Sequence, residues 1–94
     1  MPLARVVSFD GVSRERVAEM QRDAQDRGRP QEVPATEIVL LHDPDAEKAL
    51  VVLFFESEDD YRRADEALNA MPAQDTPGQR TSVAKYDVVL RMSE

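Results

Sequence analysis

The predicted elements follow the order strand, helix, strand, strand, helix, strand, which predicts an α+β, ferredoxin-like βαββαβ fold: a four-stranded antiparallel sheet with two helices on one face. The first observation behind it is the run Ala49–Phe55, which is apolar at every position. The second is a pair of amphipathic segments, one before the second strand and one after the third. Right-handed crossovers then place the first and third strands in the middle of the sheet.

The run Ala49–Phe55 also predicts assembly. Successive side chains of a strand point to opposite faces, so Leu50 and Val51 point in opposite directions and both faces must be buried. Two helices can cover one face only, and we therefore expect a homodimer formed through the other face. A charge at Val51 or Leu53, whichever face meets the partner, is expected to damage assembly because an unpaired charge would be buried there.

The first strand is predicted at Leu3–Phe9 and is ended by Asp10-Gly11. Ser13 is a good N-cap for the first helix, with Val12 and Val17 as a hydrophobic staple, and Gly28 is placed to close it. The stripe that this helix turns toward the sheet is expected to contain Val17, Met20 and Ala24.

The second strand is predicted at Thr36–His42 and forms a hairpin with the third. Ser57 is the expected N-cap of the second helix, Asp60 holds the capping-box position, and Pro72 terminates the pattern. Its buried stripe is expected to be Tyr61, Ala64, Leu68 and Met71. A polar loop over 73–81 with the turn signal Pro77-Gly78 follows.

The last strand is predicted at Ser82–Met92 from plain alternation. Its apolar face is expected to contain Ala84, Tyr86, Val88, Leu90 and Met92.

Composition narrows the functional class. The 94 residues are expected to form one domain, 1–94, with 41% hydrophobic and 33% charged residues. With 19 acidic and 12 basic residues the net charge is -7, which argues against nucleic acid as a partner. Cysteine is absent, no apolar run is long enough to span a membrane, and no secretory signal is apparent. We expect a cytoplasmic protein that does not bind membranes.

The segments Ile38–Pro44, Ala70-Met71-Pro72 and Asp75–Gly78, together with the order of elements, resemble the dimeric α+β barrel superfamily. That group includes antibiotic-biosynthesis monooxygenases, EthD-like proteins and stress-responsive barrels, and the chain is most similar to small uncharacterised bacterial members. The resemblance implies a homodimer with a ligand between helices and sheet in each protomer. The pocket that it implies would be lined by Phe9, Met20, Phe54, Tyr61, Leu68 and Tyr86.

Candidate catalytic residues are few. His42 is the only histidine, a residue type suited to general-base work near neutral pH, but a structural place at the strand end is as natural. Tyr86 could hold a ligand carbonyl or simply pack. Arg80, at the entry to the last strand, could contact an anionic group or be solvated, and Asn69 could be a pocket residue or part of the helix end.

Metal and cofactor sites are not predicted. The carboxylates around Asp43 and Glu58 lack metal-binding spacing, and haem-degrading members of the superfamily use a tryptophan that this chain lacks. We therefore expect no cofactor. The leading hypothesis is a homodimer that binds a small hydrophobic molecule. The alternative is a cofactor-independent monooxygenase or isomerase acting on an aromatic or hydrophobic substrate, and a third is an assembly module with a filled core.

Overall fold

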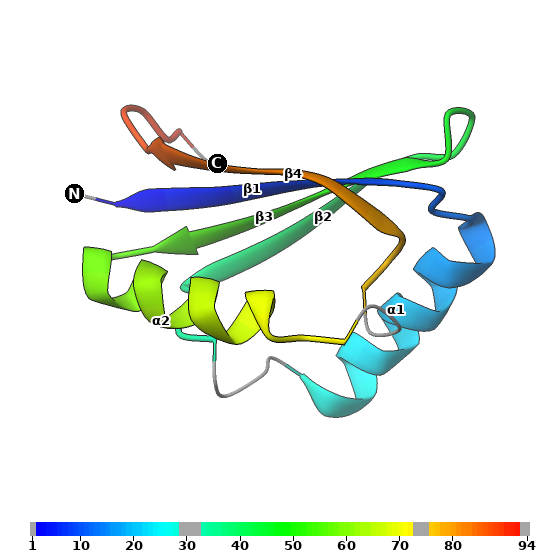
Figure 1. The fold of residues 1–94 in the computed structure, drawn as a ribbon, viewed down its shortest axis with the longest axis horizontal. Helices are drawn as coiled ribbons and strands as arrows, with labels where there is room; N and C mark the ends of the chain where they lie inside the picture. The colour runs from blue at the N-terminus through cyan, green and yellow to red at the C-terminus, as the bar shows by residue number, and fades with distance from the viewer. Residues whose placement is uncertain (1, 29–32, 73–75, 93–94) are drawn as a thin grey trace.

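The six predicted elements occur in the predicted order. The computed structural model describes residues 2–28, 33–72 and 76–92, so residues 73–75 of the predicted loop lie outside it. The elements are β1 (Leu3–Asp10), α1 (Arg14–Arg27), β2 (Glu37–Asp43), β3 (Lys48–Phe55), α2 (Glu58–Asn69) and β4 (Gln79–Asp87). The antiparallel sheet has the order β2-β3-β1-β4, with both helices on one face (Figure 1). The predicted ferredoxin-like fold, including its central β1 and β3, is confirmed.

The predicted helix caps are present. Ser13 Oγ accepts a hydrogen bond from the Arg16 amide at 3.1 Å, and Ser57 Oγ accepts one from the Asp60 amide at 3.2 Å. Each bond satisfies one of the amides that a helix start leaves without an intrahelical partner. Gly28 ends α1 with φ 70°, a backbone conformation that glycine adopts without strain.

The pairing register assigns each strand residue to a face, because directly paired residues point the same way. Arg5 pairs with Leu53 and Val7 with Val51, on the side of the helices. The expected charge test at Val51 or Leu53 is therefore misplaced, since both side chains point away from a partner docked on the free face. That free face, called the outer face below, carries Val6, Val39, Leu41, Leu50, Val52, Phe54, Ala84 and Tyr86.

β4 differs from the predicted last strand at both ends: it begins at Gln79 rather than Ser82 and stops at Asp87 rather than Met92. The pairing of β4 with β1 ends at Leu3 and Asp87, and a further backbone bond runs from the Val88 amide to Pro2 O at 3.0 Å. The expected alternation over 88–92 therefore lies outside the strand. Within this tail, Arg91 forms an ion pair with Glu37, and its guanidinium lies 4.5 Å from the centre of the Phe54 ring.

The core consists of two clusters. The first lies under α2 and contains Leu3, Val33, Ala35, Leu53, Phe55, Tyr61 and Ala64. The second lies at the start of α1 and contains Val7, Phe9, Val12 and Ala49. Val51 packs against both clusters from the centre of the sheet.

α1 covers the sheet less than its stripe predicts. No residue of α1 is buried; Val17 and Met20 are half-buried, and Ala24 is exposed. Figure 1 shows α1 leaving the sheet at an angle, whereas α2 runs along it. Val12 and Val17 hold the first turn of α1 against the second cluster, and the rest of the helix then diverges from the sheet. Space is left between α1 and the strands.

Candidate functional site

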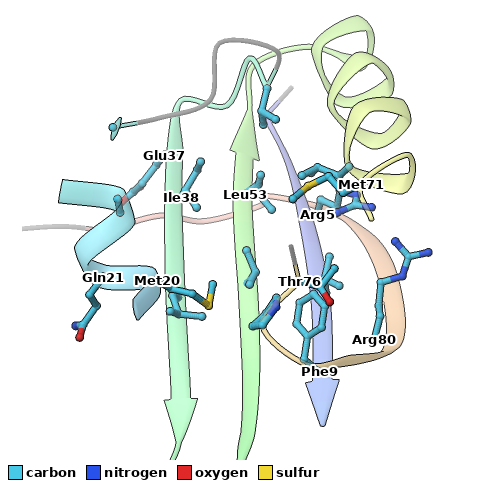
Figure 2. A pocket seen from close by; sticks show the side chains of 18 of the residues that line it. Arg5, Phe9, Met20, Gln21, Glu37, Ile38, Leu53, Met71, Thr76 and Arg80 are labelled. Atoms are coloured by element: carbon cyan, nitrogen blue, oxygen red, sulfur yellow. The ribbon is translucent and has the colours of Figure 1, made fainter. Parts of the chain in front are cut away.

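A cavity of about 590 Å³ occupies the space between α1, the end of α2 and the sheet. Its floor is formed by side chains of all four strands, and α1 and the segment after α2 form its walls (Figure 2). Most of the lining is apolar. The lining residues include Arg5, Phe9, Met20, Leu40, Val51, Leu53, Leu68, Met71 and Arg80.

Of the six ligand-contacting residues expected from the sequence, Phe9, Met20 and Leu68 line this cavity. The other three lie outside it. Phe54 and Tyr86 both pair with Ala4, which places them on the outer face, where Tyr86 is 56% exposed. Strand alternation decides these positions, because Tyr86 follows Lys85 and Lys85 points toward α2.

Tyr61 belongs to the core rather than to the cavity lining. Its ring packs edge-on against Phe55, with 5.4 Å between the ring centres. Burial raises the pKa of Tyr61 above its ordinary value, and the neighbouring Asp65 charge adds to the effect. The neutral phenol is therefore the form that the folded chain favours.

His42 lies at the end of β2, away from the cavity. Its Nε2 is 2.9 Å from Val12 O. A carbonyl oxygen only accepts, so Nε2 donates here and the ring ties β2 to the loop before α1. His42 borders a second, more polar depression of about 500 Å³ together with Ser8 and Thr81. The two expected catalytic residues, His42 and Tyr86, are thus on opposite faces of the sheet and neither lines the main cavity.

A network of polar side chains marks the side of the cavity next to α2. Arg5 is only 2% exposed, and its Nε donates to Asp65 Oδ1 at 2.9 Å. Its Nη2 donates to Asn69 Oδ1 at 3.1 Å, and Arg80 Nη1 donates to that same oxygen at 2.8 Å. Asn69 Nδ2 in turn donates to Asp65 Oδ2 at 3.3 Å. Two guanidinium groups therefore meet on one amide oxygen.

A β-bulge in β4 determines where Arg80 points. Ser8 pairs with Ser82, but Phe9 pairs with Arg80 rather than with Thr81, so Thr81 is an extra residue. The extra residue puts Arg80 on the face of Phe9, which is the cavity face. With regular pairing Arg80 would point to the outer face.

At the start of α2, Glu58 forms a salt bridge with Lys85 of β4 at 2.9 Å. The hydrogen bond to Glu58 raises the pKa of the Lys85 ammonium. Lys85 Nζ also lies 5.1 Å from the centre of the Tyr61 ring. Arg5, Arg80 and Lys85 therefore attach the sheet to three positions of α2.

Several cavity residues are not among those expected from the sequence. Arg5 shares a face with Leu3, Val7 and Phe9, so a charged residue at an inward position was the available signal. Leu40, Val51 and Met71 gave no such signal, because an apolar residue looks the same in the sequence whether it lines a cavity or fills a core.

Among residues 2–28, 33–72 and 76–92, no group of three or more histidine, cysteine, aspartate or glutamate side chains is arranged to hold a metal ion. In the same ranges no helix combines the length and the apolar character needed to cross a membrane.

Solved structures that share this architecture include the following two. One, from Chloroflexus aurantiacus J-10-fl, carries the name antibiotic biosynthesis monooxygenase; its TM-score is 0.62 at 9% identity, covering 99% of this chain and 98% of that one. The chain has the fold of that protein. The other is a mutant of MhuD with two manganese protoporphyrin IX molecules bound per active site, with a TM-score of 0.64 at 17% identity over 98% of this chain and 99% of that one.

These likenesses establish the fold, and at such identities they carry no residue roles. Comparison with protein-family models gives no match, and comparison with curated protein sequences gives no significant match.

Proposed function

We propose that this protein binds a small hydrophobic molecule in the cavity between α1 and the sheet. The observation that carries the proposal is an apolar space of about 590 Å³ between two core clusters, under a helix with no buried residue. Ligand sites are typically apolar concavities of about 300–1,000 Å³ with a few polar groups. An unfilled apolar space weakens a small domain, so a ligand would add burial that α1 does not supply.

We also propose that the protein is a homodimer joined through the outer face. On that face Leu41 is 49% exposed, Leu50 37% and Tyr86 56%, next to the half-buried Val52 and Phe54. A contiguous apolar surface of this kind is unusual on a monomer. A two-fold axis would pair the face with itself.

The alternative function is a cofactor-independent monooxygenase or isomerase acting on an aromatic or hydrophobic substrate. It is supported by the fold shared with the Chloroflexus aurantiacus protein that carries the name antibiotic biosynthesis monooxygenase. Such chemistry needs a proton acceptor within reach of the substrate. The expected acceptors His42 and Tyr86 lie outside the cavity.

Porphyrin binding gains little support from the lining. Haem iron is held by histidine, cysteine, methionine or tyrosine, and of these only methionine, at Met20 and Met71, occurs in the described lining. The geometry therefore favours binding of a metal-free molecule.

The test is titration with N-phenyl-naphthylamine, a neutral aromatic probe whose fluorescence rises in apolar surroundings. We expect saturable binding that is lost in Val51→Phe, because the larger ring fills the centre of the cavity. Val89→Phe makes the same change at a side chain that is 87% exposed and should leave binding intact. Binding that is unaffected by Val51→Phe would contradict the proposal. Oxygen uptake with bound hydroxylated aromatics would separate turnover from binding alone.

A further inference from the structure

The charges around the cavity are unevenly placed. Arg5, Arg80 and Glu37 are the charged residues among the described lining residues, but Glu37 pairs with Phe54, which places its side chain on the outer face. Figure 2 shows Arg5 and Arg80 together on the side next to Met71, with Glu37 on the opposite side. Glu37 is paired with Arg91, so its charge is compensated. The cavity therefore has one basic end in a mostly apolar lining.

Among the described residues, the basic end has two guanidinium groups and one carboxylate paired with them. Asp65 compensates Arg5 at 2.9 Å, whereas the hydrogen-bond partner of Arg80 is the neutral Asn69 amide. Among the residues that the structure describes, Arg80 has no carboxylate within ion-pair distance. Within the described part of the chain, Arg80 donates one hydrogen bond, to Asn69, whereas a guanidinium offers five N–H donors in a planar fork that matches a carboxylate.

We infer that the cavity is selective for amphipathic anions, with an apolar body on Phe9, Val51 and Leu53 and an oxyanion on Arg80. The inference rests on the proposed ligand-binding function and adds the chemical class of the ligand. Arg5 stands behind Arg80 and shares the Asn69 oxygen with it, so it positions the amide and adds positive potential without contacting solvent. Arg80 is the residue that contacts the anion.

The bulge at Thr81 supports this assignment independently of the charges. It is the irregularity that turns Arg80 from the outer face into the cavity. Bulges commonly re-aim a side chain next to a functional site. The chain as a whole carries a net charge of -7, which repels anions, so affinity for one requires a local cationic group of this kind.

The test uses a matched pair of fluorescent probes, N-phenyl-naphthylamine and its sulfonated counterpart anilinonaphthalene sulfonate. We expect the intact protein to bind the sulfonate about tenfold more tightly than the neutral probe, the size expected for a charge-assisted hydrogen bond. Arg80→Gln should abolish this preference while leaving the neutral probe unaffected, and Arg80→Lys should restore part of it. Arg63→Gln, which removes the same charge from a side chain that is 64% exposed on α2, is the control and should change neither affinity.

The outcomes separate the two proposals. If the neutral probe binds and is lost in Val51→Phe, but the sulfonate binds no more tightly, the anion selectivity is wrong and the ligand-binding function stands. If neither probe responds to Val51→Phe, the ligand-binding function itself is wrong. The comparison of the two probes on the intact protein decides the selectivity even where Arg80→Gln does not fold.

Discussion

Tyr61 shows how one side chain links packing to titration. It is 9% exposed, packs edge-on against Phe55, and has the Lys85 ammonium over its ring. Burial is the main reason why its pKa is raised, with the Asp65 charge second. Because ionisation is disfavoured in the folded chain, deprotonation of this hydroxyl lowers the stability of the folded state.

The first prediction is a loss of stability at alkaline pH through Tyr61. Its stabilising contribution is fully present below the unfolded pKa of 10.0. As pH rises past that value the unfolded chain ionises first, and the contribution is lost as pH rises through the folded pKa. Urea denaturation along a pH series should show a smaller alkaline decline for Tyr61→Phe than for the unaltered chain.

Tyr86→Phe provides the control, since it leaves Tyr61 as the only tyrosine of the chain. Phenolate absorbance of that variant should then report a folded-state pKa above 10.0. A titration at the ordinary value would contradict the argument.

Gly78 is the second residue that the fold constrains. A Cβ at this position would lie against Asp10 O and Val12 Cγ2. The segment before β4 thus approaches the end of β1 and the turn after it so closely that a side chain would not fit between them. The same approach brings β4 into its first pairs with β1, next to the bulge that orients Arg80.

At the scale of elements, the two helices are attached to the sheet by different means. α2 places Tyr61 and Ala64 in the core and is joined by ion pairs at Glu58 and Asp65. α1 buries no residue. α2 is therefore the element whose attachment can be tested by removing a single charge.

The second prediction concerns the pair between Arg5 and Asp65. Asp65→Ala leaves the guanidinium of Arg5 buried and without its carboxylate. We expect the free energy of unfolding to fall by about 2–3 kcal/mol. This loss is smaller than for a fully buried pair because Asp65 is partly exposed. Glu66→Ala removes the same charge one position along the helix, at an exposed side chain, and should stay within about 0.5 kcal/mol.

The double variant Arg5→Met/Asp65→Ala provides a further check. It removes the buried charge together with its partner, so it should be more stable than Asp65→Ala alone. Equal losses for Asp65→Ala and Glu66→Ala in urea denaturation would show that the pair does not hold α2 in place.

At the scale of the whole molecule, the sheet separates two surfaces. One face carries the helices and the cavity, and the other is a nearly continuous apolar surface crossed at one end by the contacts of Arg91 with Glu37 and Phe54. The proposed ligand binding and the proposed assembly thus use opposite faces of the same strands. Substitutions at neighbouring positions of β3 should affect them separately.

The third prediction follows from that separation. Val52→Glu places a charge in the middle of the outer face and should convert the proposed dimer into monomer or aggregate, because the charge would be buried without a partner. Light scattering coupled to size exclusion should give twice the chain mass of 10.6 kDa for the unaltered protein. Glu66→Lys should leave that mass unchanged. A monomer before any substitution would refute the dimer.

Much of this fold was predictable because it depends on local chemistry. Ser13 and Ser57 each cap a helix through bonds to nearby amides, and the run Ala49–Phe55, rich in β-branched and aromatic residues, favours a strand. The order of elements then leaves few topologies, which is why the central position of β1 and β3 could be inferred. The end of β4 could not be inferred, since it depends on how far β4 pairs with β1, and that pairing ends at Leu3 and Asp87.

The candidate site depended on three-dimensional packing. Hydrophobic periodicity marks the side of α1 that faces the sheet but not the angle at which the helix leaves it, and this angle opens the cavity. The bulge that turns Arg80 inward arises from the pairing of Phe9 with Arg80, and these two residues are 71 positions apart in the sequence. Local sequence thus specifies caps, strands and their alternation, whereas the cavity and its basic end arise from contacts between distant segments.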